Sequence, residues 1–92
     1  MEKISEWIKG DSEVCRPCFL PTLVNWFVWR LETTGRKEIA EKLKNVALNE
    51  PPEEVASLMD NIMEDVCKQD SETCSYLKEV TSIMMEAEKE TT

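Results

Sequence analysis

The hydrophobic residues of this chain recur at the spacing of an α-helix along most of its length. The clearest stripe, at i, i+3, i+4, i+7, i+8 and i+11, consists of Val55, Leu58, Met59, Ile62, Met63 and Val66. A proline of the Pro51–Pro52 pair falls in the first turn of this segment, where a missing backbone N–H costs nothing, and Glu53–Glu54 complements the positive end of the helix dipole. The pattern therefore predicts a helix that starts near this pair and buries one face.

Shorter stripes predict further helices on both sides of it. The second of them is apolar on most sides, which is typical of a helix that lies in the centre of a bundle. The four segments are roughly 2–9, 19–31, 35–48, and a last helix that starts at a break over 68–71 and runs toward residue 89. We therefore predict an all-α fold, residues 1–92 forming a single small bundle of four or five helices.

Glycine and proline set the expected helix ends. Gly10 tolerates positive φ and suits the end of the first helix, and Asp11–Ser12 offers a capping oxygen to a second helical start. A proline cannot donate the hydrogen bond that a helix interior needs, so the second helix should begin only after Pro17 or Pro21.

Composition narrows the class of protein. Of 92 residues, 41% are hydrophobic and 33% charged, and with only two Gly and four Pro the chain has too few turn residues for a many-stranded sandwich or barrel. No apolar run approaches the roughly 20 residues of a membrane span. Histidine is absent, which excludes a serine-type triad and every metal site that contains histidine.

Charge is unevenly placed along the chain. The net charge is −8, and residues 1–49 carry eight basic and seven acidic side chains while residues 50–92 carry three and twelve. The acidic half repels phosphate backbones and anionic lipids, so we expect neither a nucleic acid nor a membrane as partner. A protein partner or a homo-oligomer is expected instead, with Trp26 and Trp29 as exposed anchors.

The most specific local pattern is Cys15-Arg16-Pro17-Cys18. Two cysteines at C-x-x-C spacing can reach one another or one metal ion, and a proline between them shapes this turn in some thiol oxidoreductases. A thiolate near a helix N-terminus and beside Arg16 has a lowered pKa and is the better nucleophile. The redox hypothesis makes Cys15 and Cys18 the catalytic pair, with Cys15 attacking. The βαβ context of thioredoxin-like proteins is missing.

Cys67 and Cys74 form a second pair, and both face inward on their helical stripes. A bundle that brought them to Cys15 and Cys18 would make one site of four thiolates, which suits zinc or, as a weaker alternative, an iron–sulfur cluster. Our main hypothesis is therefore an interaction module whose four cysteines hold a structural zinc. The alternatives are the redox protein and a partner-binding protein with inert or disulfide-bonded cysteines. A disulfide between the two pairs would close a loop of about 50 residues and contribute roughly 4 kcal/mol.

The start of the chain, Met1-Glu2-Lys3-Ile4-Ser5, lacks the apolar core of a signal peptide, so we expect a cytosolic protein. Four cysteines in a short cytosolic chain favour metal or thiol chemistry over a disulfide framework, except in a hyperthermophile.

Cys15-x-x-Cys18-Phe19-Leu20, a helical stretch and then residues 51–56 (PPEEVA) together resemble the helical N-terminal part of the domain-of-unknown-function-89 phosphatase family. The resemblance covers about half of the chain. Because the chain has no counterpart to that family's larger catalytic domain, the resemblance does not imply phosphatase activity here.

Overall fold

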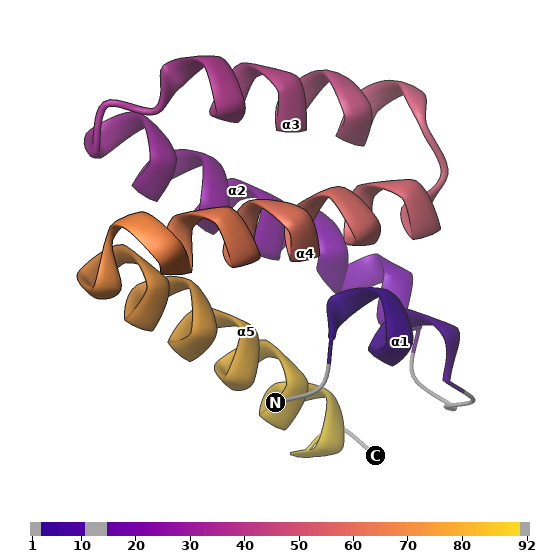
Figure 1. Ribbon diagram of the computed structural model, residues 1–92. Coiled ribbons are helices and arrows are strands. Elements are labelled where there is room, and N and C mark those ends of the chain that lie inside the picture. The colour runs from indigo at the N-terminus through magenta and orange to yellow at the C-terminus, as the bar shows by residue number, and fades with distance from the viewer. Residues whose placement is uncertain (1–2, 11–14, 91–92) are drawn as a thin grey trace.

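The computed structural model describes residues 3–10 and 15–90. Within these ranges the chain forms five helices and no strand, which confirms the predicted small all-α bundle (Figure 1). The helices are α1 (Ile4–Lys9), α2 (Arg16–Thr33), α3 (Lys37–Asn49), α4 (Pro52–Gln69) and α5 (Ser71–Glu90).

Two helices form the centre of the bundle. Both α2 and α4 contact every other helix, whereas α1, α3 and α5 pack around them. In Figure 1, α3 runs along one side of α4, α5 along the other, and α2 crosses behind. The central place predicted for the helix at 19–31 is therefore correct, and α4 shares it.

One hydrophobic core joins all five helices. The large side chains with at most 1% exposure come from every helix: Ile4, Leu23, Phe27, Leu31, Leu43, Met59 and Leu77. The predicted stripe of α4 is buried apart from Leu58, which is half-buried. Each fully buried side chain of this size contributes roughly 1.5 to 3 kcal/mol from the hydrophobic effect, so the stripe fixes α4 in the centre.

The start of α2 differs from the sequence prediction. The helix begins at Arg16, with Pro17 in its first turn and Pro21 inside it. Pro21 has no N–H to donate to the carbonyl of Pro17, four residues earlier. The helix continues through Pro21, and both prolines are exposed, so this stretch is open to solvent that can replace the missing hydrogen bond. This early start places the C-x-x-C motif at the helix N-terminus.

The helix ends use different devices. Gly10 follows α1 with φ −70° and ψ 150°, so the positive φ predicted there is wrong, whereas Gly35, between α2 and α3, has φ +82°. A Cβ atom at Gly10 would overlap the Arg16 guanidinium, which donates a 2.6 Å hydrogen bond to the carbonyl of Trp7 in α1. Gly10 thus leaves room for the contact between α1 and α2. The cap predicted at Asp11–Ser12 lies outside the described residues.

Candidate redox site

Cys15 and Cys18 form a disulfide at the N-terminus of α2. Cys15 is the N-cap residue and Cys18 lies in the first turn, with 5.3 Å between the Cα atoms and 2.11 Å between the sulfurs. The backbone N–H of Cys18 donates to the carbonyl of Cys15 at 3.1 Å. Both cysteines are exposed, so a thiol from solvent can reach this bond.

The helix favours negative charge at this position. Cys15 and Cys18 lie at the N-terminal end of the 18-residue helix α2, and the first turn of this helix contains no acidic side chain. A thiolate released from the disulfide would therefore be stabilised by the positive end of the helix dipole.

Arg16 is anchored to α1 and does not lie free beside the cysteines. Besides donating to the Trp7 carbonyl, its guanidinium lies over the Trp7 indole at 5.6 Å from the ring centroid. Trp7 itself is only 3% exposed. These contacts hold the start of α2 against the end of α1, and with it the position of the exposed disulfide.

The second disulfide, Cys67–Cys74, joins the last turns of α4 to the first turn of α5. The Cα atoms are 4.6 Å apart and the sulfurs 1.99 Å. Cys67 is half-buried and Cys74 is 8% exposed, which makes this bond far less accessible than Cys15–Cys18.

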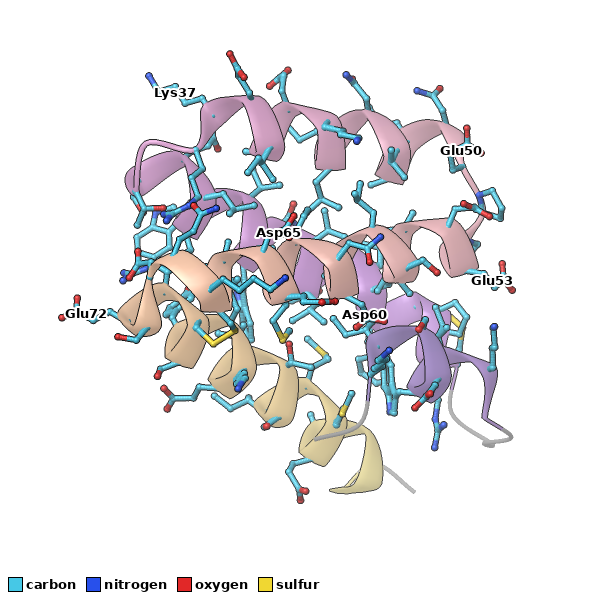
Figure 2. The ribbon with its side chains drawn as sticks, in the orientation of Figure 1. Lys37, Glu50, Glu53, Asp60, Asp65 and Glu72 are labelled. Carbon is cyan, nitrogen blue, oxygen red and sulfur yellow. A yellow bond between two sulfur atoms is a disulfide. The ribbon has the colours of Figure 1, made fainter. Side chains whose placement is uncertain are left out.

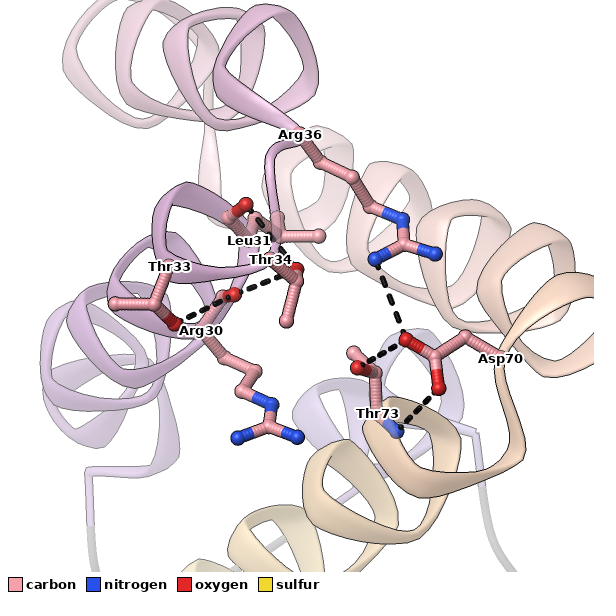
Figure 3. Close-up of polar contacts among 7 residues, drawn as sticks. All are labelled: Arg30, Leu31, Thr33, Thr34, Arg36, Asp70 and Thr73. Carbon is pink, nitrogen blue, oxygen red and sulfur yellow. Dashed lines mark hydrogen bonds and ion pairs between the residues drawn. The ribbon is translucent and has the colours of Figure 1, made fainter.

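Asp70 caps α5 between these two cysteines (Figure 3). Its carboxylate accepts hydrogen bonds from the Thr73 hydroxyl at 2.6 Å and the Thr73 backbone N–H at 3.2 Å, and it pairs with Arg36 at 3.4 Å. These bonds, foremost that from the Thr73 hydroxyl, hold the pKa of Asp70 below its ordinary value of 3.8. The connection between α4 and α5 (the Cys67–Cys74 corner) is therefore held by a disulfide and by polar contacts, as expected for a structural bond.

The structure does not bring the four cysteines together. Arg36 contacts Asp70, and Arg30 lies over the Tyr76 ring, so the Cys67–Cys74 corner packs at the C-terminal end of α2. Cys18 is twelve residues before Arg30, which corresponds to roughly 18 Å along the helix. The two pairs therefore lie at opposite ends of α2.

These positions favour the disulfide alternative over the zinc hypothesis. Each pair bonds within itself, and in the described ranges 3–10 and 15–90 no group of three or more histidine, cysteine or acidic residues is placed to hold a metal ion. The hypothesis of a disulfide between the two pairs is wrong, because each cysteine is bonded within its own pair. The two local disulfides close short loops, with sequence separations of 3 and 7.

An apolar groove of about 510 Å³ lies beside the exposed disulfide. Pro17, between the two cysteines, lines it together with side chains from α2, the end of α3 and the start of α4. This groove was not among the features predicted from the sequence. The available signal was Leu48, which falls on the side of its helix opposite to the Ile39–Leu43–Val46 stripe and is 83% exposed.

The predicted anchors differ in exposure. Trp29 is 55% exposed and its ring lies 6.0 Å from that of Tyr76, whereas Trp26 is half-buried against the core. Trp29 alone thus has the exposure predicted for the two indoles.

Comparison of the chain with protein-family models, with curated proteins and with solved structures gave no significant match in any of the three. The resemblance to the domain-of-unknown-function-89 phosphatase family gains no support from them. Among the described helices, none combines the length and the apolar character needed to cross a lipid bilayer.

Proposed function

We propose that this protein exchanges thiols and disulfides through Cys15 and Cys18, while Cys67–Cys74 is a structural bond. The observation that carries the proposal is the contrast between the two disulfides: Cys15 and Cys18 are both exposed at a helix N-terminus, and Cys74 is buried. A reactive disulfide needs access and a stabilised leaving thiolate, and the exposure of the first pair and its position at a helix N-terminus support both.

The reaction transfers two electrons from a substrate to the protein. A substrate thiolate attacks Sγ of Cys15, a new S–S bond forms, and the Cys15–Cys18 bond breaks with its electron pair leaving on Sγ of Cys18, in the first turn of α2. A second substrate thiolate then attacks the mixed disulfide. The products are a substrate disulfide and the Cys15–Cys18 dithiol, which a small-molecule disulfide reoxidises.

The same bonds bear on the compartment. Disulfides persist in oxidising compartments and are rare in the cytosol, with intracellular proteins of hyperthermophiles as the exception. Two local disulfides support an oxidising compartment rather than the cytosol expected from the N-terminal residues. The partner of the reaction is a protein or peptide that carries thiols.

The test is turnover by cysteine variants of the full chain. The substrate is a dithiol peptide, and the neutral oxidant is 2-hydroxyethyl disulfide. We expect Cys15→Ser and Cys18→Ser to lose catalysed turnover, and the Cys67→Ala/Cys74→Ala double variant to stay within about twofold of the wild type below its melting temperature.

Three outcomes would contradict the proposal. Equal small losses in all variants would leave four inert cysteines. Wild-type turnover no faster than the uncatalysed reaction would mean that the exposed bond is unreactive. Stoichiometric zinc by elemental analysis, removed by a chelator together with the fold, would restore the metal hypothesis.

A further inference from the structure

One end of the groove is formed by Pro17, the residue between the two cysteines in the sequence, although neither cysteine lines the groove itself. Pro17, Leu20, Pro21 and Val24 form its wall on α2. Cys18 precedes Pro21 by three residues, so the two are neighbours on the helix surface. The disulfide is therefore adjacent to the Pro17 end of the groove, where a bound segment that extends past Pro17 would meet it.

Apart from Lys44 and Glu50, the opposite wall is apolar, and it is open to solvent. Leu48 projects from the end of α3 with 83% of its surface exposed, and Pro52 and Val55 contribute from the start of α4. The volume of about 510 Å³ lies within the range of roughly 300 to 1,000 Å³ found for ligand pockets. An exposed apolar groove of this size accommodates several side chains of an extended segment better than it does a small polar thiol.

The Pro17 end of the groove is acidic. Glu50 lines it, and Glu53 and Glu54 follow in the first turn of α4; Figure 2 shows Glu50 and Glu53 at the same end of the molecule. Among the described residues, none of these three carboxylates forms an ion pair with a lysine or arginine.

Two cations lie near the groove. Arg16 is held against Trp7, and Lys44, at the far end of the groove, pairs with Glu32 at 3.5 Å and Glu41 at 3.7 Å. The carboxylates of Glu50 and its neighbours therefore give their side of the groove an attraction for positive charge.

We propose that this groove binds an apolar polypeptide segment in which the reacting cysteine is flanked by lysine or arginine. The inference rests on the proposed function and names its substrate class. The basic side chains pair with Glu50 and its neighbours and favour the substrate thiolate, and the apolar residues cover Leu48 and the prolines. The thiolate then attacks Sγ of Cys15 as described above, and the electron pair of the broken bond passes to Sγ of Cys18.

The test compares two peptides that differ only in charge. Both carry one cysteine among leucine and valine residues, flanked by lysine in one and glutamate in the other. The rate of mixed-disulfide formation with the oxidised full-length protein is divided by the same peptide's rate with 2-hydroxyethyl disulfide, which removes the difference in intrinsic thiol reactivity. At low salt we expect the normalised rate of the lysine peptide to be about tenfold higher. At about 1 M salt, where the Debye length is roughly 3 Å, the ratio should approach one.

Matched variants separate the charge from the apolar surface. Glu50→Gln should lower the ratio about two- to threefold, whereas Glu38→Gln, at the other end of α3, should leave it unchanged. Leu48→Asn should lower the normalised rate of the lysine peptide severalfold. Ile83→Asn replaces an equally apolar residue that is 50% exposed on α5, and it should have no effect.

The possible failures are distinguishable. If both peptides react with equal normalised rates at low salt, the substrate class is wrong while thiol exchange stands. If Leu48→Asn changes nothing, the groove does not bind the segment and the inference is overturned. If neither peptide nor any small thiol reacts, the proposed function itself fails.

Discussion

At the scale of single residues, Asp70 links the start of α5 to the connection between α2 and α3. Its carboxylate caps α5 through Thr73 and pairs with Arg36 in the α2–α3 connection, so one side chain fixes both a helix start and a tertiary contact. The sequence predicted a break and a new N-cap at 68–71, and the cap is confirmed. The pair with Arg36 was not predictable, because no local pattern encodes a contact across 34 positions.

Asp70 should contribute to acid sensitivity. Its pKa is lower in the folded protein than in the unfolded chain, so its stabilisation is complete above the unfolded value, near 3.8, and is lost as the pH falls through the lower folded value. Asp70→Asn should reduce the melting temperature at pH 7 and make the further decrease below about pH 4 shallower than in the wild type. Thermal melts from pH 7 to pH 2 check this, with the exposed Asp65→Asn as control. Parallel wild-type and Asp70→Asn curves would contradict it.

Two buried threonines in α5 should respond differently to removal of the hydroxyl. Thr73 and Thr81 are both fully buried, but Thr73 donates to a carboxylate, whereas Thr81 donates to the carbonyl of Leu77, which already has a helical partner. Hydrogen bonds to charged acceptors are the stronger ones. We expect Thr81→Val to change the unfolding free energy by less than about 1 kcal/mol. Thr73→Val should lower the melting temperature by roughly 5 °C more. Equal melting temperatures for the two variants would mean that the hydrogen bond between Thr73 and Asp70 does not contribute to stability.

At the scale of elements, the helical period predicted a bundle of four or five helices, and the structure has five in the described residues, but the period did not predict how the helices are joined. The α4 stripe was readable because one continuous apolar face must be buried whatever packs on it. The start of α2 was not predictable, because an interior proline disrupts a helix least where the stretch around it is exposed, and the exposure of Pro17 and Pro21 depends on the packing of the whole bundle.

The cysteines likewise separate what local spacing predicts from what depends on the tertiary structure. Proximity within each pair followed from the C-x-x-C spacing and from the break between Cys67 and Cys74. Whether the two pairs meet depends on the path of α2, whose length keeps them apart. The four cysteines could therefore be identified from the sequence, but the distance between the two pairs could not.

Helix α1 depends on a cap from another helix. It has six residues, too few to be stable alone, and its own N-cap, Lys3, supplies no side-chain hydrogen bond. Instead the Asp60 carboxylate of α4 accepts from the backbone N–H of Ile4 at 2.8 Å and of Ser5 at 3.0 Å, and Figure 2 shows Asp60 beside α1.

Removing this cap should release α1. Asp60→Ala should lower the unfolding free energy by about 1 to 2 kcal/mol, and Asp60→Asn, which keeps one acceptor oxygen, should lose about half as much. Urea denaturation measures both, and amide exchange should become faster at Ile4 and Ser5 in particular. Glu64→Ala, one turn further along α4 and exposed, is the control and should change stability by less than about 0.5 kcal/mol. Unchanged exchange in Asp60→Ala would show that core packing of Ile4 and Trp7 is enough.

At the scale of the whole molecule, stability combines a small core with two short covalent loops. A chain of 92 residues is expected to have an unfolding free energy of roughly 5 to 14 kcal/mol. On the chain-entropy model, loops closed over separations of 3 and 7 contribute roughly 2 kcal/mol each. The disulfides therefore supply a substantial part of the stability without being the condition for folding, because the core reaches every helix.

Reduction should consequently weaken the protein without unfolding it at room temperature. A loss of roughly 4 kcal/mol corresponds to a melting temperature lower by about 15 to 30 °C for a domain of this size. Circular dichroism melts with and without a strong reductant measure the shift. The variant with all four cysteines changed to alanine should melt near the temperature of the reduced wild type, and the reductant should not change its melting temperature. A metal-held bundle behaves in the opposite way, because a chelator lowers its melting temperature while a reductant maintains its thiolate ligands. Sensitivity to chelator alone would therefore contradict the two-disulfide structure, and sensitivity to reductant alone is the outcome we expect.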